Sequence, residues 1–575
     1  MLDLIIRNGQ ICDGTGGDIF YGDIAVEGER IVQIGDLKDA EAAHVIDAAG
    51  KTVTPGFIDP HTHVDMTVVF SPGMDGYIRQ GVTTVVAGNC GHSAAPLGKE
   101  IFFSLLEDLE FQKAAGADPA ELVNLIYDKE LAKKALKLRF NVDLDWDSFA
   151  AFYEKVNGMA LGCNIAPLVG YNAVRTSVMG KDCMRVADEE EMKRLESAVE
   201  KCMREGAFGL STGRDPLYVP GPFATDEEMI RMLRVVKAYD GIFTSHTYNT
   251  SPQGNPDRMG GYEEMIRQSR GAGVRTHISH VHVSGMAETR KEAKMAAQKT
   301  LEQFGQWRAE GTDLSFDVIP SAMCSDYTLP FFSFFIKPLV LMSGSRKQLA
   351  ENLALPEFRE MVHRMVQNGS MPHFNEDTPG NWFGRLVVLR HKENRFIGKT
   401  LKKCGELLSR KALDAMLELF RTDCDMMANL VMPDFAEAVE ILCGADNAMP
   451  CSDGVSYGGK VNLSGNDEIP MYTNPMNTGY LPRYLLCCGK ENFARAVYKA
   501  SGLVAERFHI TGRGTVKEGN YADLVILDRS RLKYFDGTED PQRDPEGVDY
   551  VFVNGKAVLV NGRITDAGNG RVLRL

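Results

Sequence analysis

Apolar and polar residues alternate in short stretches at both ends of the chain. Residues 2–53 contain LDLIIRNGQICDG and GDIAVEGERIVQIG, and after about residue 512 the same pattern returns in YADLVILD and VDYVFVNGKAVLV. A period of two between turn residues is typical of β-strands with one buried face. We therefore expect one small β-sandwich domain built from residues 1–55 and 511–575, with two unrelated β caps as the alternative.

The middle of the chain alternates apolar runs of strand length with helical patterns. The runs are, in order, TPGFIDPHTH, GVTTVVAGNC, GCNIAPLVGY, GAFGLSTG, GIFTSHTY, VRTHISHVHVSG, DLSFDVIP and NAMPCSDG. Helical segments such as DEEEMKRLESAVEKCMREG lie between them, begin with acidic or capping residues and stop at glycine. This order predicts an α/β fold, a (β/α)8 TIM-like barrel over residues 56–510. About a hundred residues separate the last two runs and predict a mostly helical insertion near the barrel mouth, at about 333–440.

Histidine, cysteine and aspartate residues stand at the carboxyl ends of these runs. His61 and His63 end the first run, Cys90 the second, His246 the fifth, His280 the sixth and Asp453 the eighth. Barrels of this kind build their active sites at that end of the strands. Only 12 histidines occur in 575 residues, so this gathering favours a shared metal ion. Imidazoles and a thiolate suit Zn²⁺.

Each of these residues also has an ordinary structural interpretation. The histidines are, taken singly, consistent with core residues, Cys90 with a small buried apolar group, and Asp453 with a turn residue before glycine. In THISHVHV, His280 and His282 share a face and His277 is out of phase, and periodicity alone does not separate the three. Together, however, the ordinary interpretations require six independent coincidences at strand ends, so we prefer the metal site.

Composition narrows the choice of partners. With 44% hydrophobic and 25% charged residues, the chain has the composition of a globular protein. A net charge of −14 disfavours nucleic acid or an anionic membrane as the main partner, and it indicates nothing more specific. The opening MLDLIIRNGQ turns polar too soon for a signal peptide, and the 12 scattered cysteines suggest no disulfide framework, so we expect a cytoplasmic protein. The oligomeric state stays open, a homo-oligomer included.

Five motifs carry a resemblance to a known family: GFIDPHTHVD, QGVTTVVAGNCGHSAAPLG, GAFGLSTG, CSDG and VAERFHITGRGTVKEGNYADLVILD. Over nearly its whole length the chain resembles the amidohydrolase superfamily and, within it, the N-acyl-D-amino-acid deacylase (D-aminoacylase) branch. GNCG is the most specific motif, because a cysteine metal ligand marks this branch. The resemblance implies one zinc held tightly by Cys90, His246 and His280, an adjoining second metal site at His61 and His63, and Asp453 as the acid/base.

The implied reaction is zinc-dependent hydrolysis of a non-peptide amide bond, with an N-acyl-D-amino acid as the family's default substrate. A metal ion activates water and polarises the amide carbonyl, and Asp453 transfers a proton to the departing nitrogen. One alternative is a cyclic amide or imide hydrolase of the dihydroorotase/hydantoinase type. A non-catalytic relative that uses the barrel as a scaffold is less favoured, because the metal-ligand residues and the aspartate are all present.

The positions expected to bind the substrate depart from the family pattern. Tyr248 stands where an arginine is usual, and Val281 and His282 stand where the family has histidine and lysine. Met476 replaces the arginine that clamps a carboxylate, and a bidentate arginine contact is not reproduced by methionine. The predicted substrate contacts are Tyr218, which matches a family position, Arg214 as a replacement cation or else a solvated loop residue, His282, Ser321 and Met476.

Overall fold

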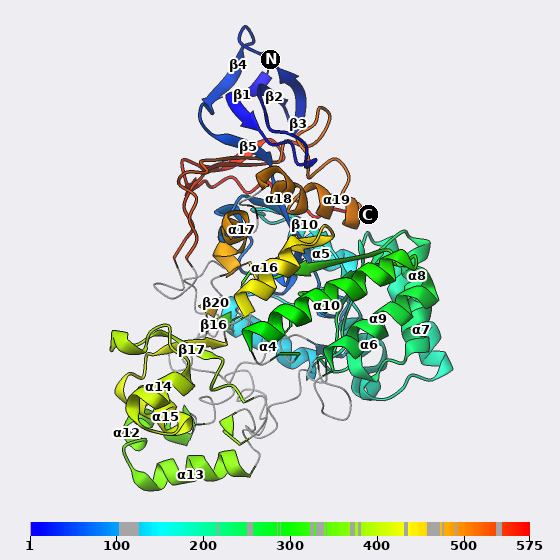
Figure 1. Cartoon of the computed structure of the whole chain (residues 1–575). Coiled ribbons are helices and arrows are strands. Elements are labelled where there is room, and N and C mark those ends of the chain that lie inside the picture. The colour runs from blue at the N-terminus through cyan, green and yellow to red at the C-terminus, as the bar shows by residue number, and fades with distance from the viewer. Residues whose placement is uncertain are drawn as a thin grey trace.

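The architecture places a parallel-stranded core between two smaller regions (Figure 1). The computed structural model describes residues 2–102, 126–215, 218–249, 257–283, 286–287, 289–321, 327–328, 339–340, 342–368, 374–377, 381–430, 435–456, 472–473, 476–487, 489, 492–535 and 543–575. A β region built from both ends of the chain covers one side of the core, and a largely helical segment lies on the opposite side.

Both chain ends contribute strands to one sheet of nine strands, in the order β24-β23-β22-β21-β5-β1-β2-β3 with β4 beside β1. Their bounds are β1 Leu2–Ile11, β2 Phe20–Glu27, β3 Arg30–Gly35, β4 Ala42–Asp47, β5 Thr52–Pro55, β21 Leu524–Leu527, β22 Val548–Val553, β23 Lys556–Val560 and β24 Arg563–Ile564. The antiparallel pair of β5 and β21, with Val53 opposite Ile526, joins the two ends. Ile6, Val53 and Leu524 share one buried core. The two ends thus form a common sheet, while its description as a two-layered sandwich stays a prediction.

The parallel strands follow one another in chain order, as their sequence pattern predicts. They are β6 Phe57–Thr62, β7 Val82–Ala87, β10 Asn164–Pro167, β11 Val169–Gly170, β12 Gly209–Gly213, β13 Ile242–His246, β14 Arg275–Ile278, β15 Leu314–Val318 and β19 Ala448–Pro450. They pair as two sheets, β6-β7-β10 and β11-β12-β13-β14-β15-β19. Only Leu168 separates β10 from β11, and a parallel bridge between Thr62 and Gly454 links the other two edges.

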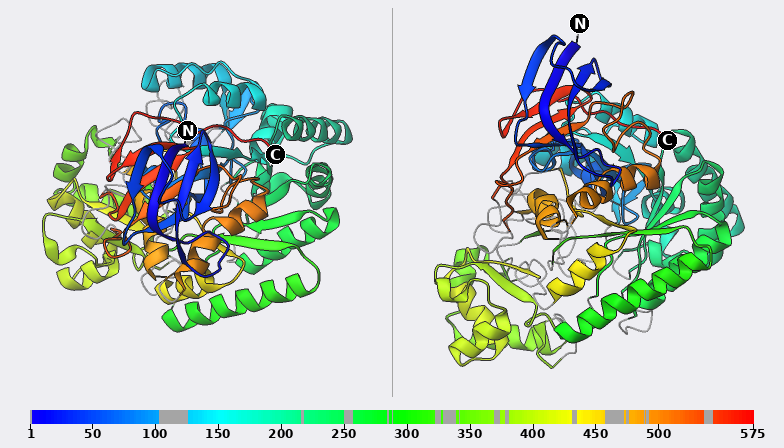
Figure 2. Two further views of the ribbon diagram at one scale, coloured as in Figure 1. Left: turned by 90° about the horizontal axis from the view of Figure 1, so that it is seen from above. Right: turned by 45° about the horizontal axis from the view of Figure 1, so that its top comes forward.

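Helices cover the outer side of the parallel strands, most visibly α7 to α10 (Figure 2). The main helices are α5 Phe149–Asn157, α6 Tyr171–Met179, α7 Glu189–Arg204, α8 Asp226–Ala238, α9 Arg258–Ala272, α10 Arg290–Ala309, α16 Ala436–Gly444, α17 Met476–Cys487, α18 Phe493–Lys499 and α19 Gly502–Phe508. Shorter or peripheral elements are α1 Val64–Thr67, α2 Asp75–Ile78, β8 Glu100–Phe102, β9 Ile126–Asp128, α4 Lys129–Phe140, η3 Gly180–Met184 and η4 Gly221–Phe223. A capping box between Asp188 and Glu191 starts α7, whose apolar stripe includes Leu195 and Val199.

The segment between β15 and β19 has a hydrophobic core of its own. It contains α12 Arg346–Asn352, α13 Pro356–Gln367, β17 Leu386–Arg390, η6 Asn394–Phe396, α14 Leu401–Leu408, α15 Ala412–Thr422 and β18 Met427–Leu430. β17 and β18 pair antiparallel, so the described part of the segment is helical with a small sheet. Val362, Leu413 and Phe420 are buried in its core. A further pair of short strands joins β16 Tyr327–Thr328 to β20 Tyr472–Thr473. The expected limits of the helical insertion, residues 333–440, stay a prediction.

The C-terminal tail extends the parallel core. The N–H of Ile165 in β10 donates to the carbonyl of Arg571 at 2.9 Å, and the N–H of Leu573 donates back to Ile165 at 2.7 Å. The tail therefore pairs with β10 along the edge that faces away from β7. Among the residues described, no helix has both the length and the apolar character needed to cross a bilayer.

Candidate metal centre

The carboxyl ends of the parallel strands carry the residues predicted to bind metal. His61 lies in the last part of β6 with His63 just beyond it, and His246 ends β13. Cys90, His280 and Asp453 follow β7, β14 and β19 within three residues. Because these strands run parallel, their ends meet at one edge of the core and bring distant segments together.

Three of these residues have a left-handed backbone, with φ of 54° for Cys90, 33° for His280 and 54° for Asp453. This conformation is uncommon outside glycine and costs on the order of 1–3 kcal/mol at each position. It turns the chain sharply where each strand ends. Such strained residues cluster at functional sites, where the surrounding structure holds them in place.

The loop that carries Cys90 is held from two sides. Asp65 accepts hydrogen bonds from the N–H groups of Gly88 and Ala94, at 2.9 and 3.1 Å. The hydroxyl of Ser211 in β12 accepts from the N–H of Gly91 at 3.0 Å. Gly91 has a φ of 76°, and a Cβ there would lie 2.3 Å from the Asn172 side chain, so only glycine fits.

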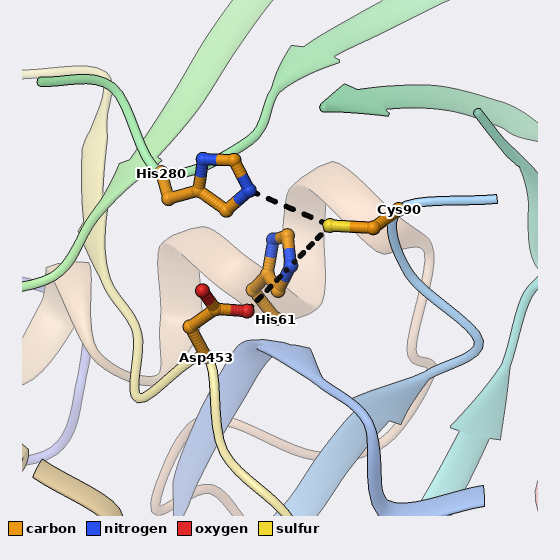
Figure 3. Close-up of side chains that lie close together, drawn as sticks. All are labelled: His61, Cys90, His280 and Asp453. Atoms are coloured by element: carbon orange, nitrogen blue, oxygen red, sulfur yellow. Dashed lines mark hydrogen bonds and ion pairs between the residues drawn. The ribbon is translucent and has the colours of Figure 1, made fainter. Parts of the chain in front are cut away.

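The candidate donors converge around the Cys90 sulfur (Figure 3). Cys90 Sγ lies 3.3 Å from His61 Nε2, 3.4 Å from His280 Nε2 and 3.7 Å from His246 Nδ1. Asp453 Oδ1 lies 3.2 Å from Nε2 of both His61 and His63. Donor atoms of His61, Cys90, His280 and Asp453 all lie within 4.8 Å of one another. The structure thus brings together all six residues that the sequence singled out.

This donor set fits a transition-metal ion. A thiolate, imidazoles and a carboxylate are the ligands that Zn²⁺ takes in proteins. His63 Nδ1 is buried and has no hydrogen-bond partner among the described residues. A buried polar atom without a partner costs about 1–3 kcal/mol, which contact with a cation or a bound ligand would offset.

Protonation in the cluster favours anionic cysteine and aspartate. Burial raises the pKa of the Cys90 thiol, but the imidazoles of His61 and His280 outweigh it and hold this pKa well below its usual value. Burial likewise opposes ionisation of Asp453, yet His61 and His63 keep its pKa well below the ordinary range. His61 and His63 show the converse: burial lowers their pKa, but the neighbouring carboxylates and the Cys90 thiolate raise it well above its usual value. A thiolate and a carboxylate at neutral pH are the forms that bind a metal ion.

Comparison with known proteins shows which family the chain resembles. Residues 44–145 match the pattern described as "Amidohydrolase family". D-aminoacylase of Alcaligenes xylosoxydans xylosoxydans is 29% identical over 99% of this chain and 97% of its own length. N-acyl-D-glutamate deacylase of the same organism is 25% identical over 100% of this chain and 96% of its own. A solved structure of D-aminoacylase, described by its binuclear metal centre, has a TM-score of 0.69 at 25% identity and covers 100% of both chains.

The chain is thus a metal-dependent hydrolase that resembles the amidohydrolases over its whole length. The resemblance to the D-aminoacylase branch, inferred from the motifs, is confirmed. The solved relatives also imply the expected architecture of a TIM barrel with an additional domain.

Two residues predicted to contact the substrate of this hydrolase lie beside the candidate ligands. The Tyr218 ring lies 4.0 Å from that of His246 and 5.1 Å from that of His92, between ring centroids. The centroid of His282 is 6.5 Å from that of His280. Contact of either residue with a substrate stays a prediction.

The other three predicted substrate contacts lie in different surroundings. The Arg214 guanidinium pairs with both carboxylate oxygens of Glu264, at 2.8 and 3.1 Å, and also donates to the carbonyl of Gly221. It is therefore buried and paired, which corrects the alternative of a solvated loop residue. Ser321 is buried just beyond β15, and Met476 is buried in the main apolar core. Their contacts with substrate stay predictions as well.

Two buried carboxylates that contact His61 were not predicted from the sequence. Asp317 in β15 contacts His61, and Asp59 in β6 accepts hydrogen bonds from the N–H groups of His61 and Ser452. Both aspartates are fully buried. The available signal was an aspartate inside an otherwise apolar strand, as in LSFDV, because a buried carboxylate needs specific partners.

Proposed function

We propose that this hydrolase uses zinc to hydrolyse a non-peptide amide bond, with an N-acyl-D-amino acid as its default substrate. One observation carries the proposal: the Cys90 sulfur lies within 3.7 Å of three imidazoles, beside the Asp453 carboxylate. The names of two relatives, D-aminoacylase and N-acyl-D-glutamate deacylase, support the substrate class. The Thr62–Gly454 bridge and the near-continuity of β10 with β11 favour one closed (β/α)8 barrel as the scaffold.

Cys90, His246 and His280 would hold one zinc ion tightly, and His61 and His63 would form the adjoining second site. A bound zinc ion would supply Lewis-acid activation of water and of the amide carbonyl. The short contact of Cys90 Sγ with His61 Nε2, 3.3 Å, supports two adjoining sites rather than two separate ones.

Asp453 would move the proton. Its carboxylate is ionised at neutral pH because His61 and His63 lower its pKa, so it can accept a proton from the attacking water. The same carboxyl group then donates that proton to the departing nitrogen, because an amide anion is a poor leaving group. Positioned proton transfer of this kind contributes about 10²–10⁴-fold to the rate.

Substrate recognition would rest on the aromatic side chains beside the ligands. Tyr218 and His282 would line the substrate's position, while Arg214, engaged by Glu264, would hold the loop after β12. Because Glu264 already engages Arg214, the carboxylate of a substrate would need another cationic partner. A cyclic amide makes fewer demands of this kind and is therefore the second candidate.

The proposal is tested by metal analysis and a substrate panel. Protein purified without chelator should contain at least one zinc per chain and hydrolyse N-acetyl-D-amino acids with neutral or acidic side chains. Chelation should abolish turnover, and zinc should restore it. Turnover of hydantoins or dihydropyrimidines alone would replace the deacylase by the cyclic amide hydrolase. Protein that retains no zinc and hydrolyses nothing would support the scaffold alternative.

A further inference from the structure

Two buried titratable residues lie beside the candidate metal centre without a part in the proton transfer just described. His277 in β14 and Asp317 in β15 are both fully buried. Their strands are neighbours, with His277 opposite Ser315 in the parallel register. A carboxylate in such a position persists only where neighbouring groups satisfy it.

Asp317 contacts three segments of the candidate centre at once. Its Oδ2 lies 3.3 Å from His61 Nδ1, on the opposite side of the imidazole from Cys90. Its Oδ1 accepts the backbone N–H of His280 and the thiol of Cys451, the latter at 3.1 Å. One carboxylate therefore reaches two proposed ligands and the segment that leads to Asp453.

These contacts set the orientation of both ligands. With Nδ1–H of His61 directed at Asp317, the Nε2 lone pair is left to face Cys90 and the metal position. The His280 backbone has a strained φ of 33°, and the bond from its N–H to Asp317 holds it there. Asp317 thus fixes one ligand through its ring and the other through its backbone.

His277 contacts the Asp317 carboxylate and helps to fix its position. Its Nε2 lies 2.7 Å from Asp317 Oδ2, and its Nδ1 lies 2.8 Å from Ser315 Oγ. Nε of Arg507, in α19, donates to the same hydroxyl at 3.1 Å. The series His61–Asp317–His277–Ser315–Arg507 therefore connects the metal end of the strands to a helix that packs against them.

From this geometry we infer that Asp317 and His277 are positioning residues for the metal centre. Asp317 orients His61 and His280, and His277 orients Asp317. The inference rests on the proposed metal centre and is independent of which amide is hydrolysed. Loss of a partner that orients a metal-binding histidine typically weakens metal binding 10- to 100-fold.

Zinc affinity, measured by competition with a chelator, tests the assignment in the full chain. Asp317→Asn should weaken zinc binding 10- to 100-fold, because an amide cannot accept from His61, His277 and the His280 N–H together. His277→Gln should weaken it less, since Asp317 stays in place. Thr276→Val is the control: Thr276 is the buried neighbour of His277, with its side chain bonded to the Val274 carbonyl. It should bind zinc like the wild type.

Cobalt substitution adds a spectroscopic readout. In Asp317→Asn the thiolate-to-cobalt band of Cys90 should persist, while the ligand-field bands shift as His61 and His280 reorient. If Asp317→Asn fails to fold, His277→Gln carries the test. Folded variants with wild-type zinc affinity and cobalt spectra would overturn the assignment. A wild-type chain that binds no zinc would instead refute the proposed function.

Discussion

The backbone N–H of Asp453 donates a hydrogen bond to the carbonyl of His61, with 3.1 Å between nitrogen and oxygen. A second bond, from the His63 N–H to Gly454, runs in the opposite direction at 2.7 Å. The proposed acid/base and two proposed ligands are thus fixed to one another through the main chain. Their side chains keep a set geometry although nearly 400 residues separate them in sequence.

Replacing Asp453 by asparagine should remove catalysis and keep the tightly bound zinc. An amide of the same size cannot take up a proton, so kcat/KM should fall about 10²–10⁴-fold. Steady-state kinetics and metal analysis of the same preparation measure both effects. Asp446→Asn is the matched control, because Asp446 is exposed and pairs with Arg495 away from the centre. Wild-type turnover in Asp453→Asn would refute the assigned role.

Replacing Cys90 by serine should cost the tight zinc and, with it, activity. The thiolate is the donor nearest to three imidazoles, and a serine hydroxyl stays protonated and binds zinc poorly. Metal content after dialysis measures the effect. Cys404→Ala removes a buried sulfur from α14, where burial raises the thiol pKa to about 11, and should leave the zinc content unchanged. Equal zinc loss in both variants would point to general instability instead.

The helical segment should lose stability at acid pH through Glu418. Hydrogen bonds from Arg421, and further contacts with Arg359, lower the pKa of Glu418 to about 2. A lowered pKa stabilises the fold above the unfolded value of about 4.3, and this contribution is lost as the pH falls towards 2. The protection of the α15 amides, measured as their exchange rate relative to that of an unfolded chain at the same pH, should therefore fall over that range.

The matched variants separate this contribution from general acid effects. Glu418→Gln should make the protection of the α15 amides less dependent on pH between about 4.3 and 2. Glu360→Gln alters an exposed i,i+4 pair with Arg364 and should behave like the wild type. An unchanged pH dependence in Glu418→Gln would assign the acid response to other groups.

Removal of residues 570–575 should destabilise the parallel core. The deletion breaks the bonds that join Gly570 to Leu161 and Arg571 and Leu573 to Ile165. Each lost bond costs about 1 kcal/mol, so the melting temperature should fall by several degrees. Calorimetry measures it, and Leu575→Ala, at an exposed end position, is the control. An unchanged melting temperature would show that the tail adds no stability.

The sequence predicted what depends on local pattern and on strand direction. Because parallel strands place their carboxyl ends together, the sequence predicts that His61, Cys90, His246, His280 and Asp453 lie close to one another, and the structure has them so. Asp317 was missed, because its partner His277 lies 40 residues away and only the register brings the two together. The pairing of Arg214 with Glu264, 50 residues away in sequence, could not be predicted for the same reason. Contacts across elements depend on register and packing, which no local pattern encodes.

The pairing of β5 with β21 also affects how the chain is made. Its two partners lie close to opposite ends of the sequence, so one edge of β5 has no strand beside it while the ribosome synthesises the residues in between. An unpaired edge is open to pairing with other chains, and contacts between such remote segments form slowly. The nine-stranded sheet therefore stays incomplete until β21 has been synthesised, and the open edge of β5 is exposed to pairing with other chains in that interval.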